Sequence, residues 1–306
     1  MVVASRFVDA NGLRVHLLEA GPGDGGGPPL VLLHGWPEFC RMWRKNIPAL
    51  AAFGFRVLAP DLRGFGDTDK ALPPGAAGLT PELLAADLAA LLDALGLDRA
   101  GIVAHDVGAY AAQAFARSWP ERTLGLFFFN RPYPGIGRRW AAPDSVPEIW
   151  YQSFNALLPW SAELVGSSRE ACRLYIGHFL RHWAADPHAF DEDLEVWVDN
   201  FMKPGNLEGG FAWYAGVRPA RMALIRDGAP ALPKIGTPAR VLWGEEDPIL
   251  RAEWTDRLPD YFADVTVSTA PGCGHFVHYE NPELANAAIA AFFTELVVPG
   301  TIASEP

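Results

Sequence analysis

The sequence predicts an α/β fold: a mostly parallel β-sheet flanked by helices, with one helical segment inserted between two of its strands. Short runs of apolar and β-branched residues recur along the chain, and most are followed by a stretch with helical periodicity. This alternation stops between residues 131 and 226, where the sequence is rich in tryptophan and shows no clear strand. With 306 residues, 50% of them hydrophobic and 20% charged, the chain can bury a sizeable core.

The strands are predicted from their composition and from the turn residues that end them. Residues 14–20 alternate in polarity after the Asn11-Gly12 turn, which predicts an outer antiparallel strand. Several of the other runs are apolar at nearly every position, as is typical of strands buried on both faces of a parallel sheet. These further strands are expected at residues 29–34, 56–61, 101–106, 124–130, 240–244 and 265–269.

Three helices are expected among these strands. Residues 80–95 carry apolar side chains at helical spacing, with Thr80 at the start and Gly96 just past the end, where each residue type favours a helix cap. Residues 107–119 and 282–296 show the same periodicity. Strands that alternate with helices in this way predict a sheet whose strands run mostly parallel.

The aromatic segment is predicted to form a helical lid. Open α/β sheets bind their ligands outside the carboxyl ends of the strands, and an insertion at this point of the chain would cover that edge. The predicted organisation is therefore a core domain of residues 1–130 and 227–306 and a cap domain of residues 131–226. The tryptophans of the segment are Trp140, Trp150, Trp160, Trp183, Trp197 and Trp213.

Charge and composition argue against several kinds of partner. Twenty-five Lys and Arg against 36 Asp and Glu give a net charge of −11, and no basic block offers a grip on phosphate, so nucleic acid is not expected. Cys40, Cys172 and Cys273 lack the spacing of a disulfide framework or a zinc site. No apolar stretch could span a membrane and no secretory signal is evident, so a cytoplasmic protein is expected. The sequence leaves open whether the chain forms a homodimer.

The strongest functional signal is the segment 103–108 (VAHDVG), between a predicted buried strand and a predicted helix. An acidic residue followed two positions later by glycine has the layout of a nucleophile elbow, a sharp turn that lifts one side chain above the sheet. The free N–H groups of the helix N-terminus favour an anionic side chain there. Asp106 could therefore attack an electrophilic carbon and form an alkyl–enzyme ester. The alternative is that Asp106 only caps the helix.

Two later segments supply an acid and a histidine. Residues 242–248 (LWGEEDP) end a strand with three acidic residues, and residues 272–276 (GCGHF) place His275 in a glycine-bounded loop. Taken singly, an acid after a strand is more often a turn residue. A nucleophile, an acid and a histidine in this order, each directly after a strand, are much harder to obtain by chance, and they indicate nucleophilic catalysis.

With residues 34–37 (HGWP) after an early strand, the chain resembles the α/β-hydrolase superfamily over essentially its whole length. HGWPE, residues 61–70 (DLRGFGDTDK) and AHDVG more narrowly resemble the epoxide hydrolases. The resemblance implies an α/β-hydrolase fold that needs no cofactor. No metal is expected either, because residues 178–182 (HFLRH) have the spacing of two zinc ligands but lack the Glu of the zinc motif and an evident third ligand. The resemblance also implies that Asp106 is the nucleophile, that His275 is the base that activates water, and that Asp247 is the acid that orients this base. The backbone N–H groups of Trp36 and Val107 would form the oxyanion hole.

Opening an epoxide also requires a proton donor for the ring oxygen, and in this family lid tyrosines supply it. Residues 210–214 (GFAWY) resemble the second lid motif and indicate Tyr214. Two candidates remain open for the first lid position. Residues 150–154 (WYQSF) resemble the usual motif and indicate Tyr151, whereas residues 175–179 (YIGHF) resemble a minority subgroup in which a histidine, here His178, partners the tyrosine.

These residues predict a hydrolase that converts an epoxide and water into a vicinal diol. A dehalogenase could use the same Asp–His–Asp set, but Val107 and Trp36 replace the residues usual in haloalkane dehalogenases, and Val107 and Tyr110 replace the arginines of fluoroacetate dehalogenases. A non-catalytic ligand-binding protein of the same fold is a third hypothesis, which an intact triad disfavours. The aromatic lid favours a hydrophobic or aryl epoxide as the substrate.

Overall fold

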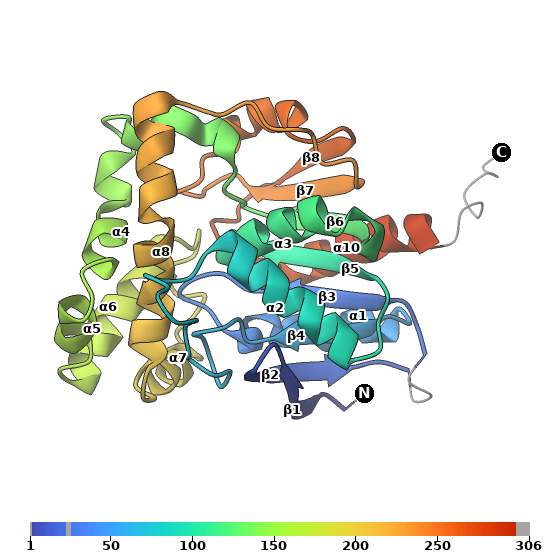
Figure 1. Ribbon diagram of the computed structural model, residues 1–306, viewed down its shortest axis with the longest axis horizontal. Coiled ribbons are helices and arrows are strands. Elements are labelled where there is room, and N and C mark those ends of the chain that lie inside the picture. The colour runs from blue at the N-terminus through green and yellow to red at the C-terminus, as the bar shows by residue number, and fades with distance from the viewer. Residues whose placement is uncertain (1, 23–25, 298–306) are drawn as a thin grey trace.

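The computed structural model describes residues 2–22 and 26–297. The described residues form an eight-stranded sheet in the order β1-β2-β4-β3-β5-β6-β7-β8 (Figure 1). The pairs β1–β2 and β2–β4 are antiparallel, and the other neighbouring pairs are parallel. The strands are β1 (Ala4–Ala10), β2 (Leu13–Ala20), β3 (Pro29–Leu33), β4 (Arg56–Pro60), β5 (Ala100–His105), β6 (Thr123–Phe129), β7 (Ala239–Gly244) and β8 (Val265–Ala270).

Helices cover both faces of the sheet. Figure 1 shows α2 and α3 in front of the sheet and α1 and α10 behind it. The central strands β3, β5 and β6 are almost entirely buried between these two layers, which explains their nearly continuous apolar sequences. The core helices are α1 (Ile47–Ala52), α2 (Pro81–Ala94), α3 (Asp106–Ser118), α9 (Val277–Glu280) and α10 (Pro282–Val297).

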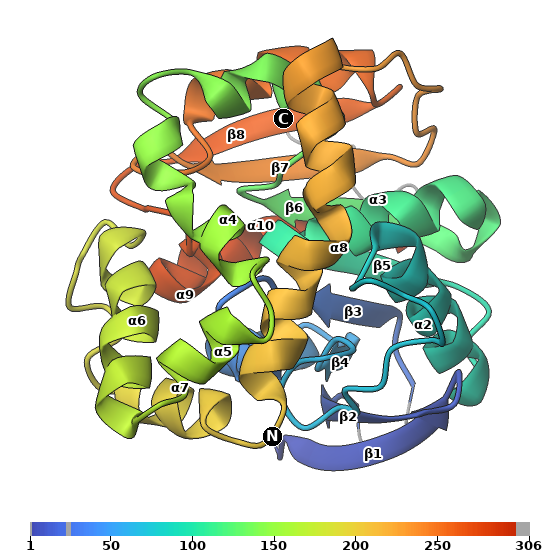
Figure 2. The ribbon, with the colours of Figure 1, turned by 60° about the vertical axis from the view of Figure 1, so that its left-hand side comes forward.

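All the remaining α-helices of the described residues lie between β6 and β7, and we call them the cap helices. They form a separate layer beside the sheet, on the left in Figure 1 and facing the viewer in Figure 2. The last of them ends at Asp227, next to the predicted boundary between cap and core. The cap helices are α4 (Trp150–Asn155), α5 (Trp160–Val165), α6 (Arg169–His182), α7 (Leu194–Phe201) and α8 (Asn206–Asp227).

The predicted fold class is confirmed, and so is the predicted start of α2. Thr80 caps α2 by accepting a hydrogen bond from the N–H of Leu83. The strand β1 was not predicted; it is mostly exposed, and pairs with β2 across the Asn11-Gly12 turn. No described helix has the length and hydrophobicity needed to cross a membrane.

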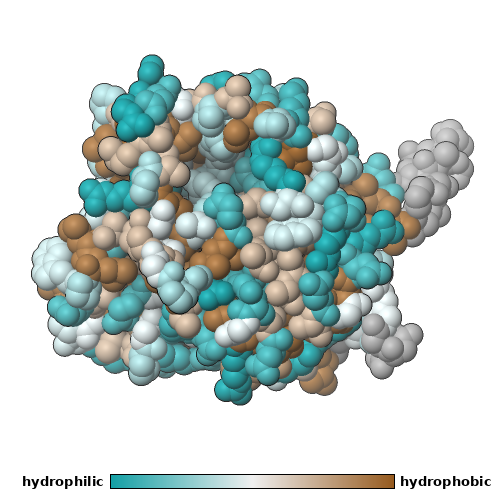
Figure 3. Space-filling model, in the orientation of Figure 1, coloured by the Kyte–Doolittle hydropathy of each residue, from teal (hydrophilic) through white to brown (hydrophobic). Residues whose placement is uncertain are grey.

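The surface of the cap carries exposed hydrophobic side chains. Hydrophobic atoms gather on the left of Figure 3, where the cap helices lie. Leu164 of α5 and Leu174 of α6 are 50% and 64% exposed, whereas Phe179 and Phe211 of the same layer are buried. The cap is therefore hydrophobic both on its inner side, against the core, and on part of its outer side.

Candidate active site

Asp106 occupies a strained turn between β5 and α3. Its φ of 43° lies in the left-handed region, which non-glycine residues rarely adopt and which is found mostly at functional sites. The turn also needs small neighbours: a Cβ on Gly35 would lie 2.6 Å from the Cβ of Asp106, and one on Gly108 would lie 2.5 Å from the carbonyl oxygen of Leu33. The local structure therefore has the geometry expected of a nucleophile elbow.

One predicted oxyanion-hole group contacts this carboxylate, and the other belongs to the next residue in the chain. The N–H of Trp36 donates to Oδ1 of Asp106 at 3.0 Å. Val107 follows in the first turn of α3, where N–H groups have no acceptor within the helix. Both predicted oxyanion-hole residues thus adjoin Asp106, Trp36 through a hydrogen bond from the loop after β3 and Val107 as its neighbour in the helix.

His275 and Asp247 form a buried pair in the loops after β8 and β7. Nδ1 of His275 lies 2.7 Å from Oδ2 of Asp247. The other oxygen of Asp247 accepts hydrogen bonds from the N–H groups of Ile249 and Leu250, at 2.8 and 3.0 Å. Asn130 adds a hydrogen bond from Nδ2 to Oδ2 of Asp247 at 2.7 Å. Asp247 is therefore held in one orientation, from which it can fix the ring of His275.

The charges around His275 favour its protonated form. Burial alone would lower the pKa of the imidazole, but the charge of Asp247, its hydrogen bond, and the charges of Asp106 and Glu38 together raise that pKa to about 9. Nε2 of His275 is buried and has no hydrogen-bond partner among the described residues. One ring nitrogen is thus held by Asp247, and the other remains free to exchange a proton.

Sequence reasoning missed two residues that support this site. Glu38 accepts the N–H of Gly35 at 2.6 Å and pairs with Nδ1 of His105, also at 2.6 Å. Burial would raise the pKa of Glu38, but the charge of His105 and their hydrogen bond lower it to about 2. Asn130, with a φ of 29°, accepts the N–H of Gly244 as well as donating to Asp247. Two sequence features could have indicated these residues: Glu38 lies within the HGWPE motif, and Asn130 comes directly after an apolar strand.

The cap meets the core at the side chain of Trp36. Tyr151 stacks on this ring at 5.3 Å, and Tyr214 packs edge-on at 5.4 Å. The two tyrosine rings are 5.5 Å apart. Burial raises the pKa of both hydroxyls, and the charge of Asp106 raises them further. Both tyrosines therefore stay protonated at neutral pH beside the elbow, as proton donors must.

The structure does not bring His178 to this cluster. Its side chain is exposed on α6, where its ring lies against Trp150, Phe179 and His182 at centroid distances of 6.4, 4.9 and 5.3 Å. Phe179, one position further along the helix, packs on Trp36 instead. Successive residues of a helix point about 100° apart, so an inward Phe179 turns His178 outward.

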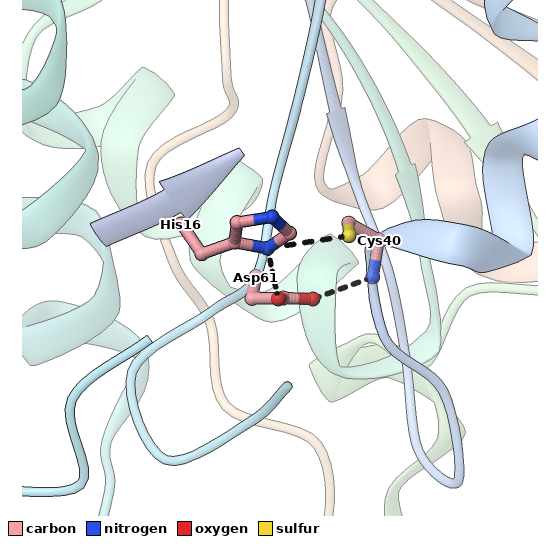
Figure 4. A group of neighbouring side chains, drawn as sticks. All are labelled: His16, Cys40 and Asp61. Carbon is pink, nitrogen blue, oxygen red and sulfur yellow. Dashed lines mark hydrogen bonds and ion pairs between the residues drawn. The ribbon is translucent and has the colours of Figure 1, made fainter. Parts of the chain in front are cut away.

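Two groups of described residues have the composition of a metal site. The first group consists of the Glu38–His105 ion pair and His278, whose ring lies 4.7 Å from that of His105. The other group is His16, Cys40 and Asp61, in which Nδ1 of His16 lies 2.7 Å from Oδ2 of Asp61 (Figure 4). Nε2 of His16 lies 2.8 Å from Oγ of Ser5. Burial raises the pKa of the Cys40 thiol, which disfavours the thiolate that a metal needs. The hydrogen bonds of this second group give it a structural role.

Comparison with known proteins agrees with this geometry. The sequence pattern of the alpha/beta hydrolase family matches residues 30–288. A soluble epoxide hydrolase from Corynebacterium sp. (strain C12) is 32% identical over 300 residues, which cover 94% of this chain and 96% of the relative. Epoxide hydrolase A from Mycobacterium tuberculosis is 29% identical over 326 residues, with coverage of 95% and 97%.

Solved structures give the same result. The epoxide hydrolase CorEH, determined without ligand, superposes with a TM-score of 0.81 at 30% identity, over 96% of this chain and 100% of that one. Sequence and structure thus agree over nearly the whole length, cap included. The chain belongs to the α/β-hydrolase family and, within it, to the epoxide hydrolases.

Proposed function

We propose that this epoxide hydrolase works through a covalent ester on Asp106. The observation that carries the proposal is the strained position of Asp106, which accepts the N–H of Trp36, together with a buried His275–Asp247 pair in which Nε2 of His275 has no hydrogen-bond partner among the described residues. A carboxylate nucleophile needs a second group to activate water for its release, and this pair supplies one.

In the first step, an oxygen of Asp106 attacks one carbon of the epoxide, and the bond from that carbon to the ring oxygen breaks. The ring oxygen takes the hydroxyl proton of Tyr214, with Tyr151 as the second donor. The raised pKa of each hydroxyl keeps its proton in place until negative charge develops on the ring oxygen. The products are a hydroxyalkyl ester on Asp106 and a tyrosinate.

In the second step, water attacks the carbonyl carbon of the ester while Nε2 of His275 takes the water's proton. The N–H groups of Trp36 and Val107 stabilise the oxyanion of the tetrahedral intermediate. Its collapse breaks the bond between the carbonyl carbon and the alkyl oxygen, which releases the diol and restores the Asp106 carboxylate. The proton that His275 takes from water stays on the imidazole and restores the protonated His275 of the free enzyme.

The two steps are coupled through charge. Ionised Asp106 is one cause of the raised pKa of His275, so the imidazole is mostly protonated in the free enzyme at neutral pH. Esterification removes the charge of Asp106, and the pKa of His275 must then fall, so that the imidazolium gives its proton, through water, to the tyrosinate. His275 therefore becomes a competent base only after the ester has formed, when a base is needed.

The experiment that tests this function compares styrene oxide with haloalkanes and haloacetates, and measures diol formed against halide released. We expect diol with little halide. Asp106→Ala should lose at least roughly 10⁴-fold in turnover, because the nucleophile cannot be replaced. Halide release without diol would contradict the proposal, and so would full turnover by the Asp106→Ala variant.

A further inference from the structure

The loop that carries His275 is fixed at three successive backbone N–H groups. The N–H of His275 itself donates to the carbonyl oxygen of Trp183, directly after α6 in the cap, at 2.7 Å. The N–H groups on either side, from Gly274 and Phe276, both donate to the side chain of Glu280, at 3.1 and 3.0 Å. The backbone position of the base therefore depends on one cap carbonyl and one carboxylate.

The same carboxylate also holds the cap. Oε2 of Glu280 accepts the N–H of Ala185 at 2.7 Å, two residues after the carbonyl that binds the loop. The loop and the cap segment approach so closely that a Cβ on Gly274 would lie 2.3 Å from the carbonyl oxygen of Trp183. Glu280 is thus shared between the loop of the base and the cap segment that lies against it.

The cap segment held in this way contacts the residues of the active site. The ring of Trp183 lies 5.2 Å from the ring of His275 and 5.1 Å from the ring of Tyr151. It also packs edge-on against Trp36, at 5.8 Å. A shift of this segment relative to the loop would therefore change the surroundings of the base.

Backbone groups stabilise the charge of Glu280. Burial raises the pKa of its carboxyl, whereas the hydrogen bonds from Gly274, Ala185 and Phe276 lower it. No cation pairs with Glu280 among the residues that the structure describes. A simple helix cap would account for the bond from Phe276, the residue before α9, but not for the bonds from Gly274 and Ala185. The carboxylate therefore does more than cap its own helix.

We propose that Glu280 is a positioning residue for the second step of the reaction, in which water cleaves the ester on Asp106. It holds the loop in the position from which Nε2 of His275 reaches this water, and it keeps the loop and the cap segment in register. Glu280 acts through His275 and exchanges no proton with the substrate. This inference rests on the proposed function and adds a positioning residue to it.

The test measures the two steps separately with styrene oxide: ester formation after rapid mixing, and ester hydrolysis in a single turnover. We expect Glu280→Ala to slow ester hydrolysis by about 10- to 100-fold, because a small displacement of a catalytic group has an effect of this size. Ester formation needs no base and should stay within about threefold of the wild type, so the ester accumulates and adds the mass of the epoxide. Glu280→Gln keeps one acceptor oxygen and should recover part of the hydrolysis rate.

Two control variants separate this role from general effects. Tyr279→Phe removes the hydrogen bond from Tyr279 to Asp193 of the cap, but no hydrogen bond to the loop of His275. Glu283→Gln removes an exposed negative charge in the first turn of α10, close to Glu280 in the chain. Both controls should hydrolyse the ester at the wild-type rate.

Unchanged ester hydrolysis in both Glu280 variants would overturn the inference. Equal slowing of the two steps in Glu280→Ala would also overturn it, and so would an equally slow hydrolysis in Tyr279→Phe, because either result assigns the effect to a general loosening of the cap. If Glu280→Ala does not fold, Glu280→Gln decides, since its side chain has the same shape as glutamate. Turnover without any ester on Asp106, in His275→Gln as well, would instead reject the proposed function.

Discussion

Two buried histidine–aspartate pairs lie in different regions of the core, and only one of them is proposed to act in catalysis. In both pairs, Nδ1 of the histidine lies 2.7 Å from an aspartate Oδ2. The pair His16–Asp61 connects β2 with the end of β4, in the antiparallel part of the sheet (Figure 4). The pair His275–Asp247 connects the loops after β8 and β7, in the parallel part.

The pairs differ at the second ring nitrogen. Nε2 of His16 is engaged by Oγ of Ser5, whereas Nε2 of His275 has no partner among the described residues. Cys40 does not turn the first pair into a second triad, because its sulfur lies 3.7 Å from the nitrogen that Asp61 already holds. A tight histidine–aspartate contact therefore does not identify a base. A free outer nitrogen and a nearby nucleophile do.

The largest difference between the two pairs is expected in turnover, when each histidine is replaced by glutamine. His275→Gln removes the base but leaves Asp106 able to open the ring, so we expect steady-state turnover to fall by roughly 10⁴-fold. The ester should then accumulate and appear as a mass increase equal to that of the epoxide. His16→Gln should stay within about threefold of wild-type turnover and lose about 1–3 kcal/mol of stability. A His275→Gln enzyme that turns over without an adduct would refute the two-step scheme.

The candidate proton donors of the cap can be distinguished in a similar way, by asking which of them holds a free proton beside Asp106. The Tyr151 hydroxyl accepts a hydrogen bond from Nε2 of Gln152 at 3.2 Å, which leaves its own proton available. We expect Tyr214→Phe and Tyr151→Phe each to slow ester formation by about 10- to 100-fold, because each leaves one donor in place. His178→Ala should change the rate by less than about threefold. Rapid mixing with styrene oxide measures this step, and a large loss in His178→Ala alone would reverse the assignment.

The proposed triad could be selected from the sequence because each member follows a strand. Parallel strands bring their carboxyl ends to one edge of the sheet, so residues far apart in the chain, such as Asp106 and His275, are expected to meet there without any knowledge of their contacts. The choice between Tyr151 and His178 depends instead on which face of α6 packs inward. Motif resemblance alone left that orientation open.

Other parts of the site depend on contacts that leave little local trace. Glu38 acts through Gly35 and His105, and Asn130 links Gly244 with Asp247. Such roles are set by which loops and helices meet, and the sequence pattern of each segment is compatible with several partners.

The smallest expected difference between the two pairs is in the pH dependence of stability. The folded-state pKa of His275 is raised to about 9 from an ordinary value of 6.5, so its stabilisation is complete below pH 6.5 and is lost as the pH rises through 9. Burial would raise the pKa of Asp61, but the hydrogen bond from His16 and nearby charges lower it to about 2. Its stabilisation is therefore present above pH 3.8 and is lost as the pH falls through 2.

Urea unfolding at a series of pH values measures both effects, each on the order of 2 kcal/mol. His275→Gln should flatten the alkaline fall in stability between pH 6 and 10 and leave the acid side unchanged. His16→Gln should keep the alkaline fall, because His275 and its charged neighbours are intact. If both variants lost the alkaline dependence equally, the raised pKa could not be assigned to the environment of His275. The protonation of His275 in the free enzyme would then have to be explained without the charge of Asp106.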